Sequence, residues 1–330
     1  MRTVAFFNNK GGVGKTSLVY HLAWMYSEMG LSVVVADFDP QANATAMFLD
    51  EDELEEFWTE GPHDKTILGV VEPIRRGKGD IAEPYIKKIT QDLGLIIGDL
   101  GLSAFEDKLS AAWPLCLDRD EAAFRTSTSL YRTLLSASEE RGADVVLIDV
   151  GPNLGAINRA ALIAAQFVVI PLAPDLFSLQ GLRNLGPTLR VWRDEWKDRL
   201  ERKPRDLDLE VPEGQMNPVG YVVMQHNVRL DRPVKYYELW MSRIPQTYRT
   251  AVLDKRLGRI ESVSQDSNCL ATLKHYRSLM PMAMEARKPI FKLTPADGAI
   301  GSHYAAVQDS KKDFRQLATE IGERIDLPIG

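Results

Sequence analysis

Cysteine is scarce in this sequence, because Cys116 and Cys269 are the two cysteines among 330 residues and no Cys-x-x-Cys pair occurs. The count and the spacing argue against a disulfide framework and against a cysteine-ligated zinc site. They favour a protein that works in a reducing compartment.

Long apolar runs are also missing. No stretch approaches the ~18 apolar residues that a membrane-spanning helix needs. Met1-Arg2 leads directly into the first expected strand, without the basic and then apolar segment of a secretory leader. We therefore expect a cytoplasmic protein without a membrane span.

The chain lacks an overall excess of positive charge, since its formal net charge is −6. The whole molecule should have no general attraction for nucleic acid or anionic lipid. The stretch from Arg183 to Arg277, however, contains 18 lysines and arginines and 13 acidic residues. This asymmetry fits either a local basic face or a solvated surface without a partner.

The most informative stretch lies near the start and reads Asn8-Asn9-Lys10-Gly11-Gly12-Val13-Gly14-Lys15-Thr16-Ser17. It follows an apolar run at residues 3–7 that predicts a buried strand, and it precedes an amphipathic run at residues 17–29 that predicts a helix. A glycine turn that binds nothing would rarely show this context. Residues 11–17 therefore predict a loop whose backbone N–H groups and helix N-terminus hold phosphates. Lys15 would reach the β- and γ-phosphates, and the Thr16 hydroxyl would bind Mg²⁺.

Acidic residues follow two further strand-like runs. The β-branched run at residues 31–36 ends in Asp37-Phe38-Asp39-Pro40, and the apolar run at residues 145–148 ends in Asp149. Carboxylates at the carboxyl ends of parallel strands lie where open α/β sheets bind ligands. Asp149 matches the Walker B pattern and would hold Mg²⁺ opposite the phosphate loop. Asp39 could instead cap a helix after Pro40, and the two roles can coexist.

Lys10 makes the loop unusual, and so does Asn9, which stands where the common phosphate loop has glycine. Lys-Gly-Gly-Val-Gly-Lys-Thr resembles the deviant Walker A loop of the ParA/MinD ATPases, closest to ParA/Soj-like partition proteins. The resemblance implies a doubly wound, mostly parallel α/β sheet with helices on both faces. It also implies a catalytic Lys10 that reaches a partner's nucleotide, a catalytic Lys15, an Asp39 that positions the attacking water, and an Asp37 in the Mg²⁺ surroundings. The lack of suitable cysteines argues against the iron–sulfur relatives of this family.

The resemblance extends over most of the chain. It covers the strand at residues 167–172, a helix from Gly181 onward, and a closing signature at residues 280–290 with a Lys-Pro-Ile strand. Gly151 replaces a proline that is usual in the family, which predicts a more flexible switch segment. By resemblance, Gln225 or Asn227 at the end of a strand beginning at residue 219, together with Pro281, would lie beside the adenine. The match is poor near residues 51–91 and 199–217, which we interpret as surface insertions in a single domain of residues 1–330.

Two basic and aromatic tracts are candidates for contact with DNA. One is the helix from Gly181, where Trp192 and Trp196 alternate with arginines and acidic residues. An exposed helix with i,i+4 ion pairs is the simpler interpretation of this pattern. The other covers residues 229–259 and includes Arg256 and Arg259. Phosphate contacts from such residues would make binding steeply salt-dependent. The helix at residues 304–324 is not followed by a basic, Leu/Phe-rich tail, so we expect no membrane attachment.

Together these features predict a ParA-like ATPase that binds ATP and Mg²⁺ and forms a homodimer around the nucleotide. The resemblance further implies ATP-gated, nonspecific DNA binding and slow hydrolysis that a ParB-like protein or a cargo adaptor stimulates. The role would be segregation or positioning of a plasmid, a chromosome region or other cargo. Two alternatives remain open: a regulatory switch that recruits proteins without DNA, and an amidoligase-type enzyme, although no glutaminase-like Cys/His set is present.

Overall fold

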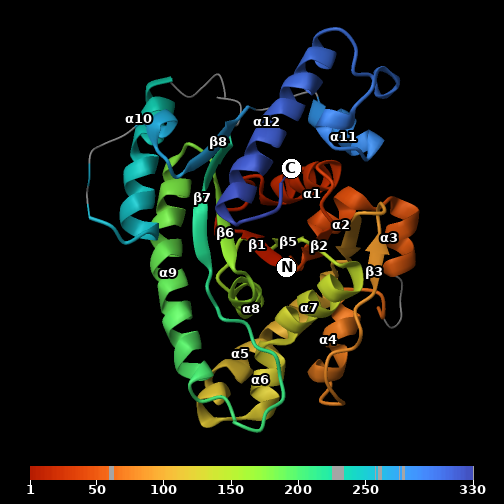
Figure 1. Cartoon of the computed structure of the whole chain (residues 1–330), viewed down its shortest axis with the longest axis vertical. Helices are drawn as coiled ribbons and strands as arrows, with labels where there is room; N and C mark the ends of the chain where they lie inside the picture. Colours follow the sequence, from red (N-terminus) through yellow and green to blue (C-terminus); the bar gives the residue numbers. More distant parts are fainter. Residues whose placement is uncertain are drawn as a thin grey trace.

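The computed structural model describes residues 1–58, 63–224, 234–256, 258, 262–274, 276 and 279–329. Within this part of the chain, eight strands form one sheet in the order β3-β4-β2-β5-β1-β6-β7-β8 (Figure 1). Every neighbouring pair is parallel except β3 and β4. The strands are β1 (Arg2–Phe6), β2 (Val33–Asp37), β3 (Ile86–Lys88), β4 (Leu93–Ile96), β5 (Val145–Asp149), β6 (Phe167–Leu172), β7 (Asn217–Met224) and β8 (Cys269–Leu273).

The central strands are buried on both faces, as their continuous apolar sequences predict. Side chains alternate along each strand, so Val4 and Phe6 join one apolar core while Ala5 and Phe7 join the other. The sheet thus separates two cores, and helices cover both of its faces. This arrangement confirms the predicted doubly wound α/β fold.

Two groups of helices supply the two cores. One core is completed by α1 (Lys15–Glu28), α2 (Asn43–Phe48), α3 (Glu51–Phe57), α11 (Leu279–Ala286) and α12 (Ser302–Arg324). The other is completed by α4 (Ile67–Arg75), α5 (Glu106–Leu115), α6 (Glu121–Ser127), α7 (Ser129–Arg141), α8 (Ala156–Ala164), α9 (Leu176–Leu200) and α10 (Val234–Thr247). Short 3-10 turns cover Leu100–Phe105, Cys116–Asp118, Val263–Gln265, Ile290–Lys292 and Pro295–Asp297, and a π-helical turn covers Tyr248–Val252. No helix in the described ranges has the length and apolar character needed to cross a membrane.

Some elements differ from the sequence expectations. The helix expected from Gly181 begins at Leu176, because the Asp175 side chain accepts a hydrogen bond from the Ser178 amide and caps the helix there. The expected Lys-Pro-Ile strand is wrong: residues 290–292 form a 3-10 turn. Sequence reasoning also missed the edge strands β3 and β8 and the helix α4.

The segment after α9, residues 201–216, contains no helix or strand and is held by side chains of α9. The Trp196 indole N–H donates to the Pro212 carbonyl at 2.8 Å. The Arg193 guanidinium donates to the carbonyls of Gln215 and Met216 at 2.8 and 3.0 Å. These backbone contacts lead the chain back to the start of β7 at Asn217.

Candidate functional site

The glycine-rich stretch forms the turn between β1 and α1, at the carboxyl edge of the sheet. Because β2, β5 and β1 are neighbours, Asp149 lies in register with both Asp37 and Phe6. The loop and the acidic strand ends are therefore brought together by the strand order. Parallel sheets bind ligands at this edge.

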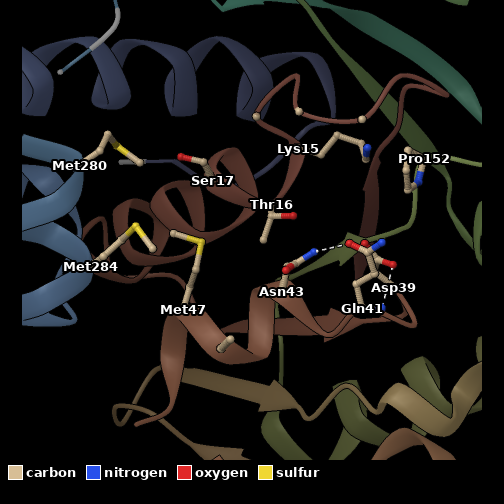
Figure 2. A pocket seen from close by; sticks show the side chains of 14 residues that line it. Lys15, Thr16, Ser17, Asp39, Gln41, Asn43, Met47, Pro152, Met280 and Met284 are labelled. Atoms are coloured by element: carbon tan, nitrogen blue, oxygen red, sulfur yellow. Dashed lines mark hydrogen bonds between the residues drawn. The ribbon is translucent and has the colours of Figure 1, made fainter. Parts of the chain in front are cut away.

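A cavity of about 430 Å³ opens between the loop and the segments that follow β2 and β5 (Figure 2). The residues that line it come from four separate stretches of the chain. They are Gly11, Gly12, Gly14, Lys15, Thr16, Ser17, Asp39, Gln41, Asn43, Ala46, Met47, Pro152, Met280 and Met284.

Two glycines of the loop need conformations that favour glycine. Gly12 and Gly14 have φ values of 70° and 86°, in the left-handed region. A Cβ atom at Gly14 would also lie 2.9 Å from Cε of Met224 at the end of β7. Gly14 is the N-cap residue of α1, so the free N–H groups of the first helical turn face the cavity edge where Lys15 and Thr16 lie.

Lys15 is 7% exposed and lines the cavity. Burial lowers the pKa of its ammonium group, whereas the negative charges of Asp149 and Asp39 raise it. A cation with so little water around it gains strongly from an anion placed in the cavity. The position suits a nucleotide phosphate.

Thr16 and Asp149 form the part of the site that could hold a metal ion. The Thr16 hydroxyl donates to Oδ2 of Asp149 at 2.8 Å, while Oδ1 of Asp149 is buried without a hydrogen-bond partner in the described part of the chain. Burial, and next the charge of Asp37, raise the pKa of Asp149 well above its usual range. A bound cation would relieve that cost, and hydroxyl and carboxylate oxygens are ligands that Mg²⁺ prefers.

The described residues contain no group of three or more His, Cys, Asp or Glu side chains arranged to bind a metal. Mg²⁺ at Thr16 and Asp149 would therefore depend on phosphate oxygens and water for its other ligands. When bound, it would neutralise phosphate charge. The residues present fit a metal that arrives with a nucleotide.

Asp37 is fully buried, and the chain itself occupies both of its carboxylate oxygens. Oδ2 accepts hydrogen bonds from the Thr45 amide and hydroxyl, each at 2.8 Å, and Oδ1 accepts one from the Asp39 amide at 3.3 Å. Burial raises the pKa of Asp37, and these hydrogen bonds oppose that effect. In this arrangement Asp37 ties the loop after β2 to the start of α2.

Asp39 lines the cavity and is 5% exposed. Its Oδ1 accepts a hydrogen bond from the Gln41 amide at 3.0 Å. The helix α2 begins only at Asn43, with Ala42 as its N-cap residue, so Asp39 does not cap that helix. A Cβ at Gly151 would lie 3.1 Å from Asp39 Oδ1, and glycine there leaves room for this carboxylate.

Lys10 is not among the residues that line the cavity, and it forms an ion pair with Asp175 of the same chain. Asn9, the other unusual loop residue, packs against α9. A Cβ at Gly181 would lie 2.8 Å from the side-chain oxygens of both Asn8 and Asn9. The loop and the first turns of α9 are thus in close contact.

The end of the cavity away from Asp39 is apolar, and Figure 2 shows the sulfur atoms of Met47, Met280 and Met284 gathered there. Pro281, expected beside the adenine, is exposed and is not among the lining residues, whereas its neighbour Met280 is. Gln225 and Asn227 lie outside the described residues. Sequence reasoning missed Met47, Met280 and Met284, as well as Gln41, Asn43 and Pro152.

Arginines of α9 have structural partners within the fold. Arg190 donates to the carbonyls of Ala251 and Val252, and Arg199 donates to the carbonyls of Trp113 and Glu195. Trp196 is 1% exposed. The interpretation of α9 as an exposed helix with i,i+4 ion pairs is therefore wrong for this face, and these arginines are engaged within the fold.

Comparisons with known proteins agree with this geometry. The AAA_31 family model, described as an AAA domain, matches residues 1–202. The chain belongs to this family, among its ParA-type members. It is 32% identical over 189 residues to Protein IncC of Escherichia coli, 30% over 194 residues to the cell division protein PomZ of Myxococcus xanthus, and 33% over 188 residues to a ParA family protein of Chlamydia trachomatis.

These matches cover 56–59% of this chain and 46%, 53% and 64% of the three relatives, respectively. Solved structures extend the likeness of fold to nearly the full length. A protein of Corynebacterium diphtheriae superposes with a TM-score of 0.68 at 23% identity, covering 98% of this chain and 99% of the other. An ATP complex of McdA from Cyanothece superposes with a TM-score of 0.63 at 15% identity, covering 99% and 97%.

Proposed function

We propose that this ParA-type protein is an ATPase that binds ATP with Mg²⁺ at the cavity described above. The observation that carries the proposal is that Lys15, Thr16 and Asp39 line one cavity at the carboxyl edge of the sheet, while the buried Asp149 accepts a hydrogen bond from Thr16 beside it. Lys15 and the loop amides would hold the phosphates, and Thr16 and Asp149 would hold Mg²⁺. Asp39 would orient the attacking water. The apolar end near Met280 and Met284 would receive the base.

We further propose that ATP drives homodimerisation through the edge that carries the loop. Three apolar side chains stand exposed there, Leu154 after β5 and the neighbouring pair Leu176 and Phe177 after β6, and Phe177 is 69% exposed. Exposed apolar groups next to a nucleotide site are typical of interfaces. In the dimer, Lys10 would reach the partner's nucleotide and stabilise charge on the transferring phosphoryl group.

Nonspecific DNA is the partner that we propose for the ATP-bound dimer. Among the described residues, Arg243, Arg249, Lys255 and Arg256 are exposed on α10 and the turn after it. A stimulating protein, ParB-like or a cargo adaptor, would speed a slow hydrolysis and release the DNA. We place the protein in the cytoplasm, at the nucleoid when DNA is bound, with residues 1–330 acting as one unit in the positioning of a plasmid, a chromosome region or other cargo.

A regulatory switch that recruits proteins without DNA is the second candidate. The observations that favour it are the net charge of −6 and the engagement of the α9 arginines within the fold. DNA binding measured with ATP, ADP and no nucleotide, across a range of salt concentrations, separates the two. Binding with ATP alone that weakens steeply with salt supports the DNA proposal. ATP-dependent dimerisation without DNA binding supports the switch.

A further inference from the structure

The ion pair between Lys10 and Asp175 joins the phosphate loop to the first turn of α9. The two side chains are 25% and 17% exposed, so the pair is largely shielded from water. Asp175 uses its two oxygens differently: Oδ1 accepts from the Ser178 amide at 2.9 Å and caps α9, and Oδ2 contacts the Lys10 ammonium. One carboxylate therefore both starts a helix and holds a lysine.

The backbone of Lys10 is fixed as well. Its amide donates to the side-chain oxygen of Asn8 at 3.0 Å, and the Asn8 amide group donates to the Pro171 carbonyl at 2.8 Å. Both ends of Lys10 are thus attached to the segment at the end of β6 and the start of α9. Because Lys15 and not Lys10 lines the cavity, this attachment keeps the second loop lysine away from the phosphate site of its own chain.

The Asp175 carboxylate is stabilised in its charged form by its neighbours. Burial alone would raise its pKa, but hydrogen bonds from Lys10 and from the Ser178 amide hold the pKa below its usual range. The carboxylate is consequently ionised at neutral pH, and Lys10 has an anionic partner in the nucleotide-free chain.

We propose that Asp175 is a positioning residue that retains Lys10 on its own subunit until a second copy presents ATP. The inference rests on the proposed function, because it assumes that Lys10 acts on the partner's nucleotide. The second copy is the occupant that fits, since Leu176 and Phe177, exposed by 49% and 69%, follow Asp175 directly. On dimerisation Lys10 gives up its ion pair with Asp175 and contacts the polyphosphate of the partner's nucleotide. Breaking the ion pair with Asp175 costs free energy, and this cost opposes dimerisation when the bound nucleotide carries less negative charge. Asp175 thereby sets the nucleotide threshold for pairing.

Asp175→Asn is the variant that tests this role, because asparagine caps helices as well as aspartate and lacks the charge. Asp175→Ser, which also keeps a capping oxygen, serves as a second version. Asp194→Asn, at an exposed position of the same helix, is the matched control.

The first measurement follows acylation of Lys10 by an amine-reactive ester in the nucleotide-free protein, with peptide mass spectrometry. Loss of a shielded ion pair should raise the labelling rate by roughly tenfold in both Asp175 variants. Labelling of the control should match the unaltered protein. Equal labelling rates of Lys10 in all four proteins would overturn the proposal, whatever the effect of ATP on dimerisation.

The second measurement follows dimerisation against ATP concentration by analytical ultracentrifugation. The ATP midpoint should fall by roughly tenfold in Asp175→Asn and Asp175→Ser, with little change in thermal unfolding. An unchanged midpoint, or weaker dimerisation, in a protein that does pair with ATP would refute the threshold role. Absence of ATP-driven dimerisation in the unaltered protein would instead count against the proposed function. It would also remove the threshold role assigned to Asp175. The labelling result would still report on the ion pair between Lys10 and Asp175.

Discussion

The Thr16 hydroxyl lies 2.8 Å from Oδ2 of Asp149, although 133 residues separate the two in sequence. The contact exists because β1 and β5 are neighbouring parallel strands that end at the same edge of the sheet, where the phosphate loop lies. It places a hydroxyl and a carboxylate side by side with one buried carboxylate oxygen left over. Such a pair suits a divalent cation that bridges protein and phosphate.

Replacing Lys15 with alanine should weaken ATP binding by about 100-fold, since a buried ammonium makes charge-assisted hydrogen bonds to phosphate. Isothermal titration with ATP and Mg²⁺ measures the change. Lys312→Ala, at an exposed position on α12, is the control and should bind as the unaltered protein does. Retained affinity in Lys15→Ala would remove the nucleotide from this cavity.

Asp39→Ala should bind ATP with similar affinity and lose hydrolysis by about 100-fold or more, because the carboxylate orients water and does not hold the phosphates. The variant should then accumulate as an ATP-bound dimer. Phosphate release and sedimentation report the two effects. Asp52→Ala, on the exposed face of α3, controls for loss of a carboxylate. Normal turnover in Asp39→Ala would assign the catalytic role to another group.

The exposed basic turn after α10 should carry part of any DNA contact. Arg259, which the sequence suggested as a partner of Arg256, lies outside the described residues, so we pair Lys255 with Arg256. Changing both to alanine should weaken ATP-dependent DNA binding and reduce its salt slope by about 2, without changing ATP turnover.

The matched control for that experiment is the double change Lys78→Ala and Arg205→Ala, which removes two exposed positive charges elsewhere. Filter binding at several salt concentrations gives both affinity and slope. If both double variants lose the same amount of DNA affinity, the effect reflects the net charge of the protein and not a contact surface.

The phosphate loop and the acidic strand ends could be predicted because their signals are local. Glycines, a lysine and a hydroxyl occupy consecutive positions, and a buried strand ending in aspartate has a plain apolar pattern. The family resemblance implies a doubly wound sheet, and the observed strand order brings Asp149 to Thr16.

Other parts of the site carry no local signal. Met47, Met280 and Met284 sit at positions that look like ordinary core, and only the folded chain shows that they face a cavity. Lys10 and Asp175 are 165 residues apart, and no periodicity links them. Likewise, the pattern of α9 could not reveal that Arg193 and Arg199 bind backbone carbonyls of segments distant in sequence.

His21 on α1 should make stability depend on pH. Its Nδ1 lies 2.7 Å from the Ser17 carbonyl, and its Nε2 accepts the Ile290 amide at 3.2 Å, so the fold uses a neutral ring that donates through Nδ1. Burial lowers the pKa of His21 from 6.5 to about 4. Below pH 6.5 His21 binds a proton in the unfolded chain but stays largely neutral in the folded chain. The free energy of unfolding should therefore fall as pH drops, by about 3 kcal/mol at pH 4 from this group alone.

Urea unfolding between pH 7.5 and pH 4 measures the effect against a His21→Gln variant. Glutamine cannot take up the proton, so the difference in free energy of unfolding between the two proteins should shrink steadily toward acid pH. His303→Gln, on α12, is the control for removal of a histidine at another position. Parallel curves for the unaltered protein and His21→Gln would show that the folded ring takes up a proton as readily as the unfolded chain does. The hydrogen bond from Ile290 to Nε2 could then not be holding the ring neutral, because a protonated Nε2 is a donor.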